Sequence, residues 1–130
     1  MEIKASLNYL RTAPRKVRLV TQLISGMGVD EAKNALRFLN KRASKPILKL
    51  LNSAIANARK NFSFDEKRIA SLYIKKIVVD EGPKLKRWMP VSRGTSHQIQ
   101  KKTSHINLVL DERKTTEIKT EKKKVEANIK

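Results

Sequence analysis

The residues best equipped for chemistry gather in one stretch, residues 84–105, which holds six lysines and arginines, two histidines and no acidic residue. His97 and His105 are the only histidines of the chain, and no carboxylate lies near either of them in the sequence. General acid–base catalysis needs a second titratable group, and a metal site needs several ligands. The stretch therefore has the composition of an anion-binding surface rather than of a catalytic centre.

The charge of the whole chain agrees with that interpretation. Its 130 residues include 30 Lys+Arg against 12 Asp+Glu, a formal net charge of +18. The excess lies in residues 1–60 and 82–110. Such an excess repels itself in the isolated protein and indicates a polyanionic partner, foremost nucleic acid. We therefore expect a nucleic-acid-binding protein and no enzyme.

Two further observations narrow the class of protein. The chain has no cysteine, which excludes disulfides, thiolate metal sites and cysteine nucleophiles, and we expect neither a cofactor nor a metal. The N-terminus lacks the apolar run of a signal peptide, and no segment approaches the 18 apolar residues of a membrane span. We expect a cytoplasmic protein with no membrane partner and no small-molecule substrate.

Three segments have the apolar spacing of amphipathic helices. The first starts at Pro14, which suits a first helical turn, the second follows Asp30, and the third spans roughly residues 44–60. The residues that they are expected to bury are Val17, Val20, Leu23 and Ile24 in the first, Ala32, Ala35, Leu36 and Leu39 in the second, and Ile47, Leu50, Leu51, Ala54, Ile55 and Ala58 in the third.

Three other segments read as strands. Residues 3–9 alternate with Ile3, Ala5, Leu7 and Tyr9 on one side. Residues 69–83 are rich in β-branched residues, with Lys75 and Lys76 indicating an exposed edge or a bulge. The segment 103–110 is the expected partner of that strand, with Ile106, Leu108 and Leu110 on one face.

The basic stretch lies between the last two strands. Pro90 and Gly94 supply turn chemistry, so residues 82–105 are predicted to form a hairpin whose arms reach roughly 35 Å. The alternative is an unstructured surface loop, although such long loops are uncommon in small domains unless they are functional or disordered. An isolated two-stranded ribbon is marginally stable in water, so we expect RNA or DNA to support it, with phosphates on its cations and a base stacked on Trp88.

Four motifs carry a resemblance to a known family: APRKVRLV (13–20), LLNSAIANA (50–58), VDEGPKLKRW (79–88) and KKTSHINLVL (101–110). In the same order they resemble the twenty-second protein family of the large ribosomal subunit, of bacterial type, over about residues 3–110. The resemblance implies an α+β fold of three helices packed on a small three-stranded antiparallel sheet, with a long protruding β-hairpin. Residues 1–110 would form one domain that includes the hairpin. Residues 111–130 lie outside the resemblance, and their nearly balanced charge and lack of a sustained apolar face predict a charged tail that is disordered or a fraying helix.

The same resemblance implies a function. Such proteins are structural constituents of the large subunit that bind its rRNA and support assembly, and the hairpin tip lines the nascent-peptide exit tunnel. The implied partners are large-subunit rRNA, neighbouring ribosomal proteins including the fourth large-subunit protein, and the nascent polypeptide, with macrolide antibiotics near the tip.

Site residues follow position by position from the motifs. The implied rRNA-binding residues are Arg11, Arg15, Lys16, Arg18, Lys84, Lys86, Arg87, Trp88, Arg93, Lys101, Lys102 and His105, although for His105 packing within the sheet is an open alternative. The implied tip consists of Pro90, Val91, Ser92, Arg93, Gly94 and Thr95. The family usually has arginine or lysine where this chain has Met89, Val91, Thr95, Gln98 and Gln100, and often serine where it has Ala13. We therefore expect a tip that holds RNA less tightly and leaves the tunnel wall more apolar.

One rival hypothesis comes from another class. Architectural DNA-binding proteins insert basic β-arms with an apolar wedge into a minor groove, and residues 88–91 (WMPV) resemble such a wedge. Those proteins generally act as dimers, and the sequence has no obvious self-complementary seam. Competition between rRNA fragments and duplex DNA distinguishes the two hypotheses.

Overall fold

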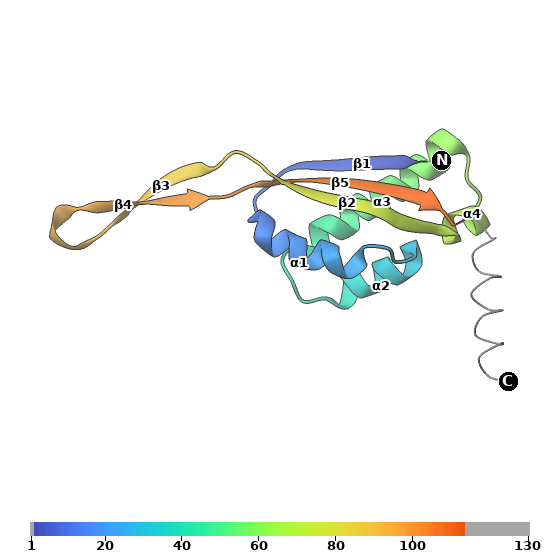
Figure 1. Cartoon of the computed structure of the whole chain (residues 1–130), viewed down its shortest axis with the longest axis horizontal. Coiled ribbons are helices and arrows are strands. Elements are labelled where there is room, and N and C mark those ends of the chain that lie inside the picture. Colours follow the sequence, from blue (N-terminus) through green and yellow to red (C-terminus); the bar gives the residue numbers. More distant parts are fainter. Residues whose placement is uncertain (1, 114–130) are drawn as a thin grey trace.

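A computed structural model describes residues 2–113 of the chain as a small α+β body with a long two-stranded extension (Figure 1). The elements in chain order are β1 (Ile3–Leu10), α1 (Pro14–Ile24), α2 (Val29–Phe38), α3 (Ser44–Phe62), α4 (Glu66–Ala70), β2 (Leu72–Glu81), β3 (Leu85–Pro90), a 3-10 turn (Ser92–Gly94), β4 (Ser96–Lys101) and β5 (Ser104–Glu112). The three predicted helices, the predicted strands and the α+β class are confirmed. The short helix α4 was not predicted.

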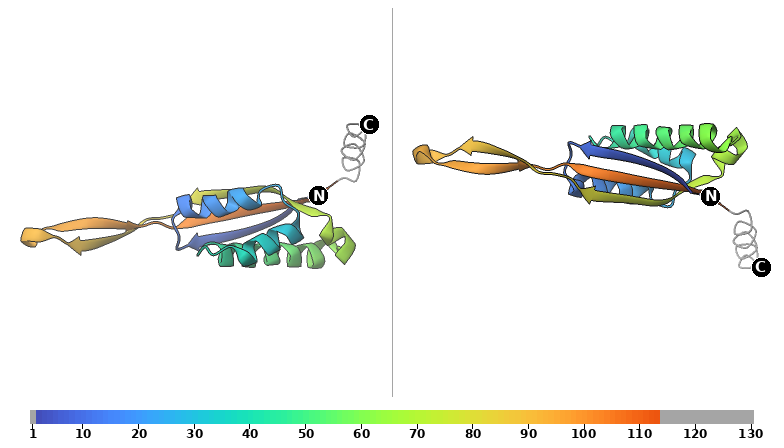
Figure 2. Two further views of the ribbon diagram at one scale, coloured as in Figure 1. Left: turned by 90° about the horizontal axis from the view of Figure 1, so that it is seen from below. Right: turned by 90° about the horizontal axis from the view of Figure 1, so that it is seen from above.

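The body contains a three-stranded antiparallel sheet in the order β1-β5-β2. Ile106, Leu108 and Leu110 of β5 are buried, whereas Asn107 between them is exposed, as the alternation predicted. Helices α1, α2 and α3 cover the inner face of the sheet, and the view from above shows the opposite face (Figure 2). Strand β5 is the central strand of the sheet and follows β4 in the chain. The extension is therefore connected directly to the centre of the body.

Helix α3 provides much of the core. Its buried residues recur at spacings of three and four, and Leu51, Ala54 and Ala58 are fully inaccessible to solvent. The helix packs against β1 and α2, where its alanines permit close approach of the neighbouring backbone. The strongest helix prediction is thus confirmed, with nearly the predicted limits.

Two predictions from the apolar patterns are wrong, the burial of Leu23 and the side of β1 on which Tyr9 lies. Leu23 is 45% exposed, because it lies on the side of α1 that faces away from the sheet. Tyr9 is 66% exposed, because its backbone has a positive φ of 56° and the pairing of β1 with β5 shifts between Leu7 and Leu10. This irregularity turns Leu10, instead of Tyr9, against the core.

The predicted irregularity at the two lysines of β2 is confirmed. Strand β2 lies at an edge of the sheet, and its register with β5 shifts between Ile74 and Lys76. The extra residue is Lys75, whose Nζ lies 2.9 Å from Oε1 of Glu2 and 2.9 Å from Oδ2 of Asp111. The bulge thus places a cation between two carboxylates.

The sequence-based prediction placed the start of the C-terminal tail at residue 111, which is two residues too early. Strand β5 continues through Asp111 to Glu112, because these residues pair with Tyr73 and Leu72. The rest of the predicted tail lies outside the described residues. Within residues 2–113, no helix is long and apolar enough to cross a membrane.

Candidate nucleic-acid interface

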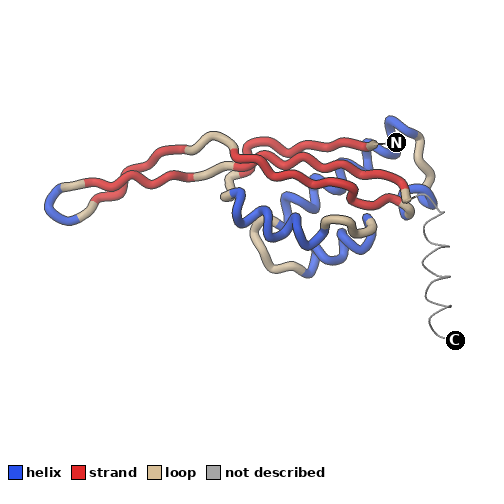
Figure 3. The backbone as a smooth tube through the Cα atoms, in the orientation of Figure 1, coloured by secondary structure: helices blue, strands red, loops and turns tan. Residues whose placement is uncertain are grey.

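The extension is a regular antiparallel ribbon, which we define as β3, β4 and the turn between them (Figure 3). Its pairing runs from Leu85 opposite Lys101 to Pro90 opposite Ser96. No side chain of β3 is buried, and in β4 only Ile99 is partly covered. The hairpin prediction is confirmed over the unstructured loop, and the ribbon has no packing partner within the described part of the chain.

The two faces of the ribbon differ in chemistry. Alternate residues share a face, so Lys86 and Trp88 lie on one side with their partners Gln98 and Gln100. Trp88 is 68% exposed, which leaves its ring accessible for stacking on a base. The other face carries Leu85, Arg87, Met89, His97, Ile99 and Lys101. One face therefore offers an aromatic platform, and the other a mixed apolar and cationic strip.

The tip is a tight turn at residues 91–95. Val91 N–H donates to the Thr95 carbonyl at 2.9 Å, and Thr95 Oγ1 donates to the Ser92 carbonyl at 2.8 Å. Arg93 and Gly94 both have positive φ, of 59° and 67°. Glycine tolerates this conformation, but for Arg93 it is strained. The turn places Arg93 at the far end of the ribbon.

The ribbon joins the body through what we call the neck, residues Gly82, Pro83 and Thr103. Gly82 N–H donates to the Thr103 carbonyl at 2.9 Å, and Thr103 Oγ1 donates to the Pro83 carbonyl at 2.7 Å. Thr103 is buried, and a Cβ on residue 82 would collide with its hydroxyl. The neck thus fixes the direction in which the ribbon leaves the sheet, and only glycine fits at position 82.

His105 lies in the sheet beside the neck, away from the arms of the ribbon. Its Nδ1 accepts a hydrogen bond from the Tyr9 N–H at 3.1 Å, and the two rings meet edge to face with centroids 4.8 Å apart. These contacts match the sheet-packing alternative for His105. Because Nδ1 of His105 already accepts this hydrogen bond, it is not available for the proposed phosphate contact.

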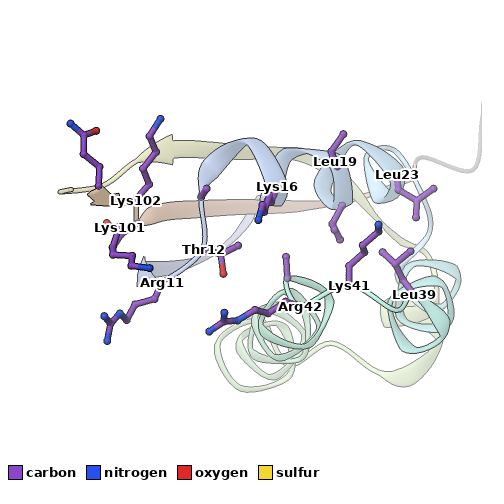
Figure 4. Close-up of a pocket in the computed structure, with 15 residues that line it drawn as sticks. Arg11, Thr12, Lys16, Leu19, Leu23, Leu39, Lys41, Arg42, Lys101 and Lys102 are labelled. Carbon is purple, nitrogen blue, oxygen red and sulfur yellow. The ribbon is translucent and has the colours of Figure 1, made fainter. Parts of the chain in front are cut away.

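A groove of about 880 Å³ opens where the neck meets the helices (Figure 4). The start of α1, the connection between α2 and α3, and the end of β4 with the residues after it form its walls. Six cations line it and no acidic residue does: Arg11, Lys16, Lys41, Arg42, Lys101 and Lys102. Residues far apart in the sequence therefore combine into one electropositive surface.

The groove unites four of the predicted site residues, Arg11, Lys16, Lys101 and Lys102. Sequence reasoning missed Lys41 and Arg42. The available signal was the basic run NKRASK at residues 40–45, which falls in the break between two predicted helices. A basic connection between helices is free to face a polyanion, so this run deserved the same interpretation as the hairpin.

Other predicted residues lie elsewhere. Arg15 is exposed on α1 outside the groove. Arg18 donates from Nη2 to the Val79 carbonyl at 3.1 Å, which braces α1 against β2. Lys84 lies 3.8 Å from Glu81 at the start of the ribbon. Arg18 thus links α1 to β2 within the body.

The helix ends add to the positive potential of the groove. Helices α1 and α3, which begin at its wall, have alanine at the N-cap, Ala13 and Ala43, and no acidic residue in the first turn. Helices α2 and α4, which begin elsewhere, carry Asp30 and Glu31, and Glu66, in that turn. Since helix N-termini are electropositive, carboxylates there would weaken the attraction for an anion. Their absence at the groove leaves this potential uncompensated.

The groups with clearly shifted pKa values lie at the end of the sheet that is farthest from the neck. The hydrogen bond from Lys75 lowers the pKa of Asp111 to about 2, and the same lysine lowers the pKa of Glu2. The hydrogen bonds to Asp111 and Glu2 raise the pKa of Lys75. Among residues 2–113, no group of three histidines or carboxylates could hold a metal ion. The acidic residues thus stabilise the sheet at the end away from the cationic surfaces.

Comparison with known proteins gives a consistent result. A family model described as ribosomal protein L22p/L17e matches residues 5–111. The chain is 50% identical over 113 residues to a Thermus thermophilus protein called large ribosomal subunit protein uL22, which covers 87% of this chain and 97% of that protein. Proteins of the same name from Bdellovibrio bacteriovorus and Mycoplasma capricolum are 48% and 46% identical and are covered in full, over 87% and 88% of this chain.

Proposed function

Because the chain belongs to the ribosomal protein L22p/L17e family, we propose that it holds large-subunit rRNA on two surfaces, the groove and the ribbon. Membership confirms the family resemblance and makes the chain a structural constituent of the large ribosomal subunit, with rRNA and ribosomal proteins as partners and no enzymatic role. The observation that carries the proposal is the convergence of six cations, without one carboxylate, at the point where the ribbon leaves the body.

The mechanism is electrostatic and geometric. Lysines and arginines of the groove neutralise phosphates and release their counterions, which gives affinity without reading sequence. The neck sets the angle at which the ribbon enters the RNA, and the RNA supplies the packing surface that the ribbon lacks in its own chain. Trp88 then stacks on an accessible base.

The tip has a separate role in this proposal. Residues 90–95, with Arg93 at the end of the turn, line the nascent-peptide tunnel, beside the fourth large-subunit protein and near the site of macrolides. Val91 is 37% exposed and Met89 50%, in keeping with the lightly charged tip that the sequence indicated. Arg93→Ala is expected to alter nascent-chain passage or macrolide binding more than subunit assembly. Failed assembly with normal passage would contradict this assignment.

The salt dependence of rRNA binding tests the groove. With about six phosphate contacts, the slope of log affinity against log salt is expected to be roughly −4 to −5. Lys101→Ala and Lys102→Ala should each flatten the slope by about 0.7–0.9. Lys67→Ala is the matched control, because Lys67 is exposed on α4 and does not line the groove. Slopes unchanged in both variants would exclude these lysines from the interface.

Competition with duplex DNA tests the rival function. Binding to rRNA fragments should persist in excess duplex DNA as the salt concentration rises. A preference for duplex DNA that is maintained at high salt would favour the architectural DNA-binding hypothesis instead.

A further inference from the structure

One end of the groove is apolar. Leu19 and Leu23 lie one turn apart on α1 and are 66% and 45% exposed, and Leu39 faces them from the end of α2 (Figure 4). Residues at i and i+4 share one side of a helix, so the two leucines form a continuous apolar surface. An amphipathic helix would normally bury such a pair. Here the pair borders a cationic recess.

The cations occupy the rest of the groove in an ordered way. Arg11, Lys101 and Lys102 lie at the end next to the neck, Lys16 lies between that end and the leucines, and Lys41 lies beside Leu39 (Figure 4). One end of the groove is therefore purely cationic, and the other combines an apolar surface with a lysine. A partner that matches it must carry negative charge and an apolar face within one short segment.

An unpaired nucleotide has these two features, and a paired one does not. In an A-form helix the base faces are stacked on each other, so the helix presents phosphates and hydroxyls to a protein. A nucleotide in a loop or bulge exposes the face of its base beside its own phosphates. The six cations, with no lining acid, argue against a basic ribosomal protein as the occupant.

We propose that the groove holds an unpaired nucleotide of large-subunit rRNA, with its base on Leu19, Leu23 and Leu39 and the adjacent phosphates on Lys16 and Lys41. This inference rests on the proposed rRNA-binding function and specifies which form of RNA the groove selects. Aliphatic side chains form no hydrogen bonds, so the site selects for an exposed base without selecting its identity.

Chemical probing of protein-free large-subunit rRNA tests the proposal. The protein should protect at least one unpaired nucleotide from a reagent that acylates flexible 2′-hydroxyls. In the double variant Leu19→Gln/Leu23→Gln that nucleotide should become reactive again, while hydroxyl-radical protection of neighbouring backbone persists. Loss of the contact with two leucines should lower the affinity about tenfold.

Phe38 offers a matched control outside the groove. Phe38 is 89% exposed at the end of α2 and does not line the groove, so Phe38→Gln removes an equally apolar surface residue. It should leave every protection in place. Thermal unfolding should show both variants folded, because none of the three side chains is buried in the core.

The possible failures are distinguishable. If the wild-type protein protects rRNA and the leucine variant leaves the same pattern and affinity, the groove binds phosphates alone and this inference is wrong, while the proposed function stands. Equal loss of protection with Phe38→Gln would likewise overturn it. If the wild-type protein protects no rRNA at all, the proposed function itself fails.

Discussion

The body and the ribbon use the same backbone geometry but differ in what stabilises them. In the body, each sheet strand turns a row of apolar side chains against the helices, and Ile74, Ile106 and Leu110 are fully buried. In the ribbon, no residue of β3 or β4 is buried, and the strands are joined by backbone hydrogen bonds and one tight turn. Burial contributes most to folding, so the body has a core that can hold it together, whereas the ribbon has no core of its own.

The charges divide along the same line. Several of the described acidic side chains form ion pairs within the body, as in the contact of Arg68 with Glu112 at 2.9 Å. Residues 82–110 contain no acid at all, and none lines the groove. The charges of the body are thus partly paired with each other, whereas the charges of the ribbon and the groove suit an anionic partner such as RNA.

The sharpest contrast comes from removing a large side chain in each region. Leu51→Ala in α3 should lower the free energy of unfolding by about 2–5 kcal/mol, because Leu51 is fully buried and leaves a cavity. Trp88→Ala removes a larger side chain from the ribbon and should change it by less than about 0.5 kcal/mol. Thermal or denaturant unfolding measures both. A large loss from Trp88→Ala would mean that the ribbon packs on the body.

The neck is where the two regions are coupled. Gly82→Ala should destabilise the protein by about 1–3 kcal/mol, because the new methyl group collides with Thr103. Amide exchange at Gly82 should also accelerate as its bond to Thr103 weakens. Gly28→Ala is the control, since its Cβ would meet only Glu31, at 3.7 Å. Equal stability of both variants would show that the neck tolerates a side chain.

A substitution of Arg18 tests whether a cation close to the candidate interface stabilises the body instead of binding RNA. Arg18→Lys keeps the charge but loses the guanidinium bond to the Val79 carbonyl, so stability should fall by about 0.5–1.5 kcal/mol. The salt dependence of rRNA affinity should stay the same. A flattened salt slope with unchanged stability would assign Arg18 to the interface instead of the body.

The smallest effect belongs to the acidic end of the sheet and depends on pH. The pKa of Asp111 is lowered to about 2 by Lys75, so its contribution to stability is complete above the ordinary carboxyl pKa of 3.8 and is lost as the pH falls towards 2. Asp111→Asn should lower the melting temperature slightly at neutral pH and flatten its decline between about pH 4 and 2. Melting curves across that range measure the effect, and parallel curves for the two proteins would exclude it.

Periodicity was sufficient to predict most of the body. The spacing of Leu50, Leu51, Ala54 and Ala58 fixed the inner face of α3, and the alternation of Ile106 to Leu110 fixed that of β5. It failed at Tyr9, where a single residue of positive φ reverses the alternation. It also failed at Leu23, because apolar spacing does not distinguish a buried apolar face from an exposed one.

The candidate interface was only partly predictable. The ribbon is contiguous in sequence, so its cations and turn could be identified directly. The groove is assembled from three distant segments, and Lys41 and Arg42 join it only through the packing of α2 and α3. His105 and Arg18 show the reverse case, since their residue types suggest phosphate contacts while their bonds to Tyr9 and Val79 lie within the body.

Amide hydrogen exchange on the free protein and on its complex with large-subunit rRNA tests the central claim most directly. In the free protein, the amides of β3 and β4 should exchange rapidly while those of α3 and β5 are protected. Binding of rRNA should slow exchange in the ribbon and leave the core amides unchanged. Ribbon amides as protected as the core in the free protein, or unaffected by rRNA, would contradict the account.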